Sequence, residues 1–467
     1  MRPVFVVLAI AFLATVVPRV SAQTVTAQSQ VPPAFLGGVP TGMATAEPLP
    51  LSIVEAIGRA LRYNLGMINA QRAMERAAST RERELADLLP NVSARLAETR
   101  QKVNLAAFGF PLPAGIPSVV GPFNVFDARV YVSQAIVDFK AVNDLRAETH
   151  NRAAAEFSYK SARDLVVLVS GNAYMQTLAA SARAETAQAQ LQTADALYRQ
   201  AVDLKAGGLV AGIDVVRAEV QLATERQRVT ASNNAFEKAK LQLARIIGMP
   251  IGQEFTLSDK LPALPVPDMA LDEALERAYK TRPDYQAALE RVRAAEDTRR
   301  AISGESLPAF RVNADFGDIG LTPGDARGTF AVAAAVTVPV YQGGRNRARV
   351  AEADLDLKAR QSEAEDLRAG IYYEVRSAFL DLRASDEQLQ VATRARDLAA
   401  DQLAQARDRF SAGLADNIEV IQAQEAVTLA SEQYINALYS NSIAKALLAR
   451  GLGVAEEAAR LLFGKIP

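Results

Sequence analysis

A stretch that occurs twice decides the fold of this chain: AGGLVAGIDVVRA at residues 206–218 and SAGLADNIEVIQA at residues 411–423. Both copies place small residues and a leucine just before an acidic residue and an apolar helical pattern. Each copy closes a run of more than 60 residues that contains almost no Gly or Pro. In an internal repeat, each copy has to cover the apolar surface of its neighbour. The sequence therefore predicts a duplicated, helix-rich architecture.

Helices are expected on both sides of each repeated stretch. Long helices over 141–206 and 345–412 precede the two stretches, and shorter helices over 213–247 and 418–450 return after them. A rise of 1.5 Å per residue makes each long helix about 100 Å long. In the second returning helix, small and apolar residues step by three and four, a spacing typical of knobs-into-holes packing. These residues are Val420, Ala423, Val427, Ala430, Tyr434, Ala437, Asn441, Ala444 and Leu448.

A strand hairpin is predicted before each long helix. Apolar and polar residues alternate over about 91–104 and 125–137 in the first copy, and over about 309–317 and 329–340 in the second. A period of two indicates strands with one apolar and one polar face. Before each hairpin, a helix is expected to end at a Leu-Pro pair. The helices cover 51 to about 88 and 271 to about 303.

The strands have the length of tilted membrane strands. A small soluble sheet is the alternative. However, four strands with one long polar face cannot close a barrel by themselves, and strands in a bilayer must have their edges paired. Oligomerisation would meet that requirement.

The chain ends and the connector complete the predicted organisation. Residues 1–22 have a basic start, an apolar run too short to span a bilayer, and small residues before a cleavage point near Ala22, which together indicate a signal peptide. The expected segments are an irregular N-terminal segment at 23–50, a first repeat at 51–250, a mid-shaft connector at 251–270, a second repeat at 271–455 and a C-terminal segment at 456–467.

The sequence shows no catalytic constellation, so we expect no enzyme, cofactor or metal site. Cysteine is absent, and the only histidine, His150, falls early in a long helix, where a structural or surface role is expected. The formal net charge is −1 and becomes −3 when Arg2 and Arg19 leave with the signal peptide, which argues against a nucleic-acid-binding surface.

The repeated turns carry the candidate functional residues. Exposed tips with small residues would let a partner approach closely, and these tip candidates are Gly207, Gly208, Leu209, Gly413 and Leu414. Asp214 and Glu419 occupy matching positions just after the tips. They could simply be acidic residues favoured in a first helical turn. Alternatively, if copies assemble around an axis, they would form a charge ring that favours cations.

The Gly-Leu turns are the last part of an order that occurs twice: a Leu-Pro pair, a strand hairpin, a long helix and the turn. With this order, the chain resembles the TolC-like outer-membrane efflux protein family over about residues 50–455. The fold class that the resemblance implies is mainly α with a small β part. Four strands from each of three copies would form a trimeric twelve-strand outer-membrane barrel, continued by a periplasmic α-helical barrel. The polar strand face would then line the barrel lumen, with Asp127, Arg129, Arg311 and Asp315 as candidates.

The resemblance also implies a site and partners. In the family an acidic pair can line the periplasmic constriction. The matching residues here are Glu419 and Gln422, so the second acid is replaced by a neutral amide. The implied partners are a periplasmic adaptor, which would dock at the tips, an inner-membrane pump of the resistance-nodulation-division or ABC type, and outer-membrane lipid. We therefore expect a passive exit duct in the outer membrane of a Gram-negative-type bacterium. A periplasmic coiled-coil adaptor or scaffold without a pore is the alternative.

Overall fold

The computed structural model describes residues 31–109, 115, 117–259, 269–412, 414 and 417–463, and residues Pro33–Pro467 form one compact unit. The expected signal peptide at 1–22 lies outside the described residues. So do parts of the segments expected at 23–50, 251–270 and 456–467.

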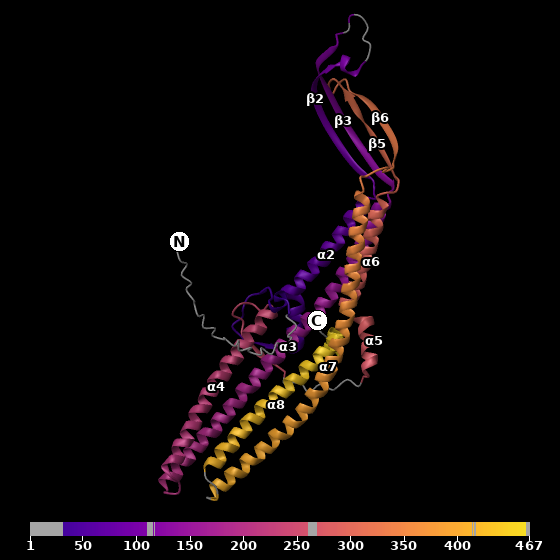
Figure 1. The fold of residues 1–467 in the computed structure, drawn as a ribbon. Helices are drawn as coiled ribbons and strands as arrows, with labels where there is room; N and C mark the ends of the chain where they lie inside the picture. The colour runs from indigo at the N-terminus through magenta and orange to yellow at the C-terminus, as the bar shows by residue number, and fades with distance from the viewer. Residues whose placement is uncertain are drawn as a thin grey trace, which may run out of the picture. The chain divides into compact units, whose positions relative to one another are not determined.

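Helices dominate the unit, and the same order of elements occurs twice (Figure 1). Two short helices, two strands, one long helix and one returning helix follow one another in each half. The first half consists of α1 (Ile53–Tyr63), α2 (Leu65–Ala86), β2 (Asn91–Asn104), β3 (Val119–Val137), α3 (Phe139–Ala206) and α4 (Gly212–Ile246). The second consists of α5 (Leu271–Thr281), α6 (Pro283–Gly304), β5 (Ala309–Gly320), β6 (Arg327–Thr337), α7 (Arg345–Ser411) and α8 (Asn417–Gly451).

Smaller elements complete the unit: η1 (Pro33–Leu36), β1 (Leu49–Leu51), η2 (Leu105–Phe108), β4 (Phe255–Leu257) and α9 (Ala455–Phe463). β1 and β4 pair in parallel beside the start of α1. The C-terminal helix α9 was not anticipated from the sequence. Its first turn is held by α3, because Asp164 Oδ1 accepts a hydrogen bond from Glu456 N at 3.3 Å and Arg163 forms an ion pair with Glu456 at 2.6 Å.

The longer helices form a single layer in which the neighbours of α3 change halfway along its length. Beside the returning helices the order is α4–α3–α8–α7, and nearer the strands it is α2–α3–α6–α7 (Figure 1). Most of the periodic residues of α8 are buried, as their spacing predicts. Val420 and Ala423 are 0% exposed and Leu448 is 1% exposed. The matching face of α4 is less covered, since α4 lies at the edge of the layer.

The expectation of one unbroken helix before each hairpin is wrong. The first helix pair breaks at Asn64 and the second at Arg282. Asn64 caps the new helix by accepting a hydrogen bond from Gly66 N at 2.9 Å. In the second pair, Pro283 opens α6, where its missing N–H is no loss but where it cannot continue α5.

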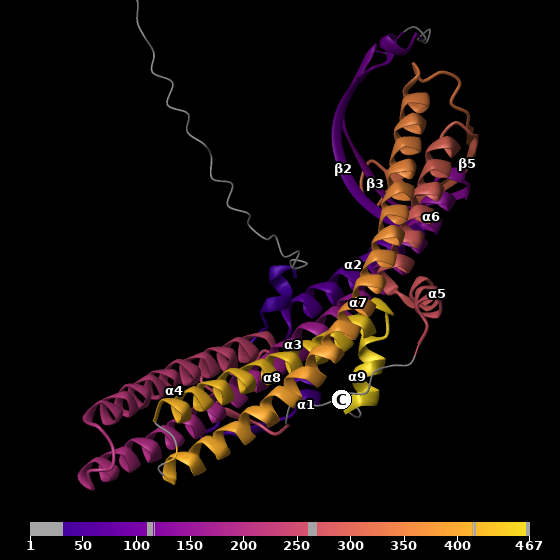
Figure 2. The same cartoon turned by 60° about the horizontal axis from the view of Figure 1, so that its bottom comes forward.

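The four longer strands form one antiparallel sheet in the order β2–β3–β5–β6, and β2 and β3 are strongly curved (Figure 2). β3 starts at Val119, earlier than expected, because its pairing with β2 continues past a register shift between Gln101 and Val103. β6 ends at Thr337 rather than near 340, since Pro339 has no N–H for the ladder.

The sheet exposes its apolar face, the reverse of a soluble sheet. Phe316, Phe330 and Val332 are 68%, 76% and 69% exposed, whereas the Arg129 side chain on the opposite face is only 17% exposed. Along β6, the larger apolar residues Phe330, Val332 and Val336 all lie on this exposed face. Such a surface needs an apolar partner, which water does not provide.

Among the described residues, one helix is long and apolar enough to cross a membrane by length and composition alone. It is α3, which contains an 18-residue window of mean hydropathy 1.2, and 67% of that window is buried within the protein. The burial fits the central place of α3 in the layer, where its apolar side chains pack against α1, α4, α6 and α8.

Candidate functional site: the helix tips and the polar face of the sheet

The tip of the first helical hairpin is closed by a glycine motif. α3 ends in a turn in which Leu209 N donates to Leu204 O at 2.9 Å and Gly208 N donates to Lys205 O at 3.0 Å. Gly208 has φ +74°, a conformation that suits glycine, and Gly207 precedes it in a helical conformation. This pair of hydrogen bonds is the Schellman motif, which satisfies the last free carbonyls of the helix.

The second tip has the matching hydrogen bond, from Leu414 N to Arg409 O at 2.8 Å. Gly413 lies outside the described residues. Leu209 and Leu414 are 74% and 73% exposed, so each tip presents one bare leucine beside small residues. The tips can therefore offer apolar contacts and close backbone approach.

The candidate acids just after the tips both have cationic neighbours. Arg217 Nη1 lies 3.2 Å from Asp214 Oδ1, and Arg409 Nε lies 3.3 Å from Glu419 Oε1. Neither ion pair was expected from the sequence, although the first has the i,i+3 spacing of helical ion pairs. Gln422 is exposed on the same helix as Glu419. The acids are therefore partly compensated within one chain.

The two tips are joined to each other. Asn417 is 1% exposed, and its Nδ2 donates to the backbone oxygen of Asp214 at 2.9 Å. This bond places the start of α8 against the start of α4, so Asp214 and Glu419 lie at the same end of the helical layer.

Three of the four polar-face candidates come together around one arginine. Arg129 Nε lies 3.2 Å from Asp127 Oδ1, Arg129 Nη1 lies 2.9 Å from Asp315 Oδ2, and Arg129 Nη2 donates to Thr329 Oγ1 at 3.2 Å. Gly317 leaves the room for this reach, since a Cβ there would lie 2.8 Å from Arg129 Cβ. The cluster ties β3, β5 and β6 together on one face.

Arg311, the fourth candidate, is not part of this cluster. It pairs in register with Ala135, on the same face of β5 as Asp315 but nearer the helices. There it lines a recess with Asp87, Asp138 and Asp144 at the junction of strands and helices.

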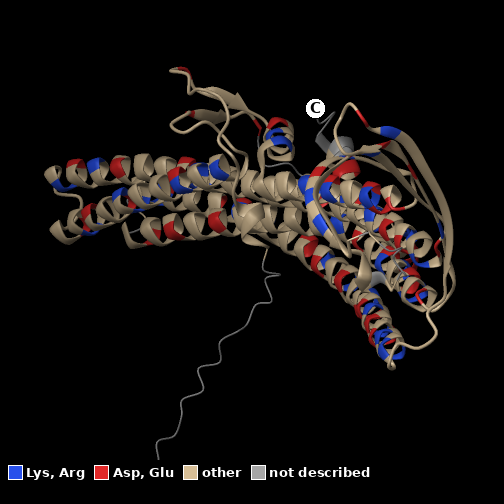
Figure 3. Ribbon diagram, turned by 90° about the horizontal axis from the view of Figure 1, so that it is seen from above, with Lys and Arg blue, Asp and Glu red and all other residues tan. Residues whose placement is uncertain are grey.

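His150 has a structural setting. Its Nδ1 lies 2.6 Å from Glu290 Oε2, and its Nε2 lies 3.7 Å from Asp297 Oδ2, both on α6. Arg293 and Arg300 pair with the same two carboxylates. The histidine thus helps to join α3 to α6. Along the helices, cationic and anionic residues are intermixed (Figure 3).

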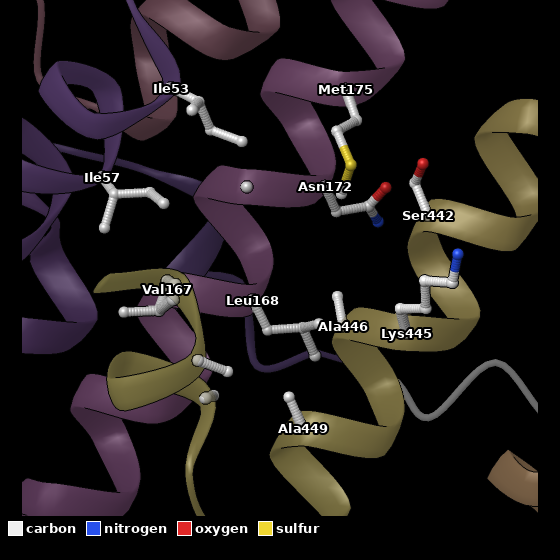
Figure 4. A pocket seen from close by; sticks show the side chains of 14 residues that line it. Ile53, Ile57, Val167, Leu168, Asn172, Met175, Ser442, Lys445, Ala446 and Ala449 are labelled. Atoms are coloured by element: carbon white, nitrogen blue, oxygen red, sulfur yellow. The ribbon is translucent and has the colours of Figure 1, made fainter. Parts of the chain in front are cut away.

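A small recess lies between α1, α3, α8 and α9 (Figure 4). Its volume is about 50 Å³, and it is lined mainly by apolar side chains such as Ile57, Val167 and Met175. Burial lowers the pKa of Lys445 at its rim. Pockets for drug-sized ligands measure about 300–1,000 Å³, so this recess is too small for such a molecule. Within the described residues, no group of three metal-ligating side chains is present.

Known proteins with similar sequences and structures are outer-membrane channels. The outer membrane efflux protein family matches residues 56–249 and 274–454. Outer membrane protein TolC of Escherichia coli K12 is 24% identical over 354 residues, covering 72% of this chain and 70% of TolC. The pyoverdine export outer membrane protein OpmQ of Pseudomonas aeruginosa is 26% identical over 395 residues, covering 79% of this chain and 78% of OpmQ.

A similar fold is found in the CmeC outer membrane channel of Campylobacter jejuni, with a TM-score of 0.74, 17% identity and coverage of 86% of both chains. The family match spans both halves of the chain and most of their helices and strands. The chain belongs to the outer membrane efflux protein family and is an outer-membrane efflux channel.

Proposed function

We propose that three copies of this chain form a passive exit duct, with a twelve-strand barrel in the outer membrane and a periplasmic helical barrel below it. The observation that carries the proposal is that the sheet and the helical layer are open at matching edges. First-half elements form one edge at every level, namely β2, α2 and α4, and second-half elements form the other, namely β6 and α7. One head-to-tail contact could therefore pair all levels at once, and such a contact gives a closed ring when three rotations complete a full turn.

The edge helices carry unpaired apolar side chains on which this contact can be built. On α4, Ile213, Val216 and Val220 are 53%, 52% and 61% exposed and step by three and four. On α7, Leu380 and Val391 are 63% and 70% exposed. Burying such side chains between neighbouring copies stabilises the ring by roughly 25 cal/mol per Å² of apolar area.

The sheet needs both the ring and the bilayer. A bilayer strand with an open edge leaves backbone groups unpaired, at a cost of several kcal/mol each, so β2 and β6 must find partners. Closure would place the Arg129 cluster on the water-filled inside and Phe316, Phe330 and Val332 against lipid.

The duct itself has no energy source, so a pump must drive transport. We infer that an inner-membrane pump, of the resistance-nodulation-division or ABC type, acts through a periplasmic adaptor that docks at the tips. The exposed Leu209 and Leu414 beside small residues support this role. Asp214, Glu419 and Gln422 would then line the periplasmic aperture. The alternative of a periplasmic adaptor or scaffold without a pore gains no support from the relatives, which are channels.

Two neighbouring substitutions on β6 test the barrel. Val332→Arg puts a charge on the apolar face, where it should cost about 2–4 kcal/mol per chain in the bilayer and abolish heat-resistant oligomers in the outer membrane. Ala331→Arg puts the same charge on the polar face and should leave assembly intact. Equal tolerance of both variants in membrane fractions would contradict the proposal, because a sheet with water on both faces would not distinguish them.

A further inference from the structure

We propose that the barrel favours multivalent anions, and that Arg95 on β2 is the residue that carries this preference. The inference rests on the proposed trimeric duct and deepens it by naming the chemical class of solute that the barrel interior accepts. That class is solutes with two or more phosphate or carboxylate groups.

The register of the sheet places Arg95 directly opposite Arg129 on the polar face. Residues directly opposed on neighbouring strands have Cβ atoms about 4.5–5.5 Å apart, and like charges there are destabilising. Folding of the sheet therefore does not explain a second arginine at this point. A role toward something that enters the lumen does.

The two arginines differ in their partners. The charge of Arg129 is held by Asp127 and Asp315 at 3.2 and 2.9 Å. Arg95 is exposed, and no carboxylate of the described residues lies within ion-pair distance of it. Because the guanidinium of Arg129 repels it and no acid holds it, Arg95 can extend into the lumen and meet a passing anion.

The rest of the polar face adds to the positive charge. Arg327 lies in the row of Asp127 and Ile319, is exposed, and likewise has no carboxylate of the described chain within ion-pair distance. Arg311 lies apart from them, in the recess that it lines with three aspartates. The other three arginines on this face, with two aspartates, leave one net positive charge per chain. These residues are Arg95, Arg129, Arg327, Asp127 and Asp315.

Ring closure would concentrate this charge. Arg95 is on the edge strand β2 and Arg327 on the edge strand β6, so joining β6 of one copy to β2 of the next brings both to the same seam. Three seams would form a ring of cationic side chains, and rings of arginine favour anions in pores. Guanidinium groups also bind phosphate and carboxylate in a two-pronged geometry.

The test is ion selectivity of the purified full-length oligomer in planar bilayers, measured as the reversal potential across a KCl gradient. Low salt is needed, because the Debye length shrinks to about 3 Å at 1 M. Arg95→Gln should shift the reversal potential toward cation preference. The control is Arg100→Gln on the same strand, which makes the same charge change on the opposite face, in the row of Asn124, and should cause no shift.

A second readout uses inorganic tripolyphosphate added on the barrel side. It should block the wild-type channel, and Arg95→Gln should weaken this block at least about tenfold, since each lost contact is a charged hydrogen bond. Arg95→Lys keeps the charge and should keep the reversal potential, which separates loss of charge from a folding defect.

The outcomes distinguish the two claims. Normal conductance with identical reversal potentials and block in Arg95→Gln and Arg100→Gln would overturn the role of Arg95 but leave the duct intact. A wild-type oligomer that forms no channels would overturn the duct and this inference together.

Discussion

In both halves of the chain, a pair of short helices changes direction at one buried polar residue, Asn64 in the first half and Arg282 in the second, 218 positions apart. Asn64 is 0% exposed and uses its amide on the backbone: Nδ2 donates to Phe35 O at 2.8 Å and to Ile246 O at 3.2 Å. Arg282 is 4% exposed and uses charge, pairing with Asp284 at 2.5 Å and Glu374 at 2.6 Å.

At each break between the two short helices, a glycine that follows a returning helix packs closely against the break. Gly248 follows α4 with φ +62°, and a Cβ there would lie 2.6 Å from Tyr63 Cβ. Gly453, 205 positions later, follows α8 with φ +68°, and a Cβ there would lie 2.8 Å from Arg282 Cα. The two halves therefore share a backbone solution at the junction and differ in the polar chemistry that fills it. Backbone geometry is the stricter requirement of the two.

If backbone geometry is the stricter requirement, substitutions of the two glycines should destabilise the protein most. Gly248→Ala and Gly453→Ala should each lower the free energy of unfolding by more than about 3 kcal/mol, because a left-handed backbone costs an L-residue about 1–2 kcal/mol and the new methyl meets neighbouring atoms. Denaturant unfolding of the purified protein, followed by helical circular dichroism, measures the loss.

Gly252→Ala is the matched control for these variants. Its φ is +82°, but no heavy atom lies within 4 Å of the added Cβ. Gly252→Ala should therefore lower the free energy of unfolding only by the cost of a left-handed backbone at an L-residue, about 1–2 kcal/mol. Equal losses in all three variants would show that close packing against the breaks contributes nothing.

Arg282→Ala should come next, lowering the free energy of unfolding by about 2–4 kcal/mol, since it leaves Asp284 and Glu374 without their shared cation. Arg282→Lys keeps the charge but not the forked geometry, and it should fall between the alanine variant and the wild type. If Lys and Ala behave alike, geometry rather than charge stabilises this junction.

Asn64→Ala should cost somewhat less, about 2–3 kcal/mol in the free energy of unfolding, through a lost helix cap and two unpaired carbonyls. Asn64→Asp keeps the acceptor for Gly66 N but turns a negative charge toward those carbonyls. At pH 7, Asn64→Asp should lower the free energy of unfolding at least as much as Asn64→Ala. A stable Asn64→Asp protein would show that the two donor contacts are dispensable.

The smallest effect should be a difference in pH dependence between the junctions. Burial tends to raise the pKa of Asp284, but the hydrogen bonds and charge of Arg282 outweigh it and lower the pKa below the ordinary 3.8. A lowered carboxyl pKa gives stability that is complete above 3.8 and is lost as the pH falls through the folded-state pKa.

Unfolding free energies measured from pH 7 down to pH 2 check this sign. The gap between wild type and Arg282→Ala should narrow at the acid end, whereas the gap between wild type and Asn64→Ala should stay constant. Parallel narrowing of both gaps would mean that the acid effect arises elsewhere in the chain.

The sequence was enough to predict the elements with a strong period or a repeated turn. The tips, the long helices and the alternating strands follow from local spacing alone. The breaks at Asn64 and Arg282 were missed, although Pro283 disfavours helix at the residue before it and Asn is a common helix cap. Both signals were outweighed by the apparent continuity of the surrounding helical pattern.

Side-chain partners across strands were harder to predict. Arg95 shares a row with Arg129 only because of a register that contains a shift between Gln101 and Val103. Alternation tells which face a residue occupies, but the partner across the sheet depends on where the two strands align. The ion pair of Arg409 and Glu419 was likewise hard to predict, because it depends on how the end of α7 and the start of α8 are placed across the turn between them.

Single-channel recording of the purified wild-type protein shows whether three chains close into one water-filled duct. We expect heat-modifiable trimers that insert into planar bilayers and give uniform conductance steps. A protein that remains monomeric and never raises the conductance of the bilayer would contradict it.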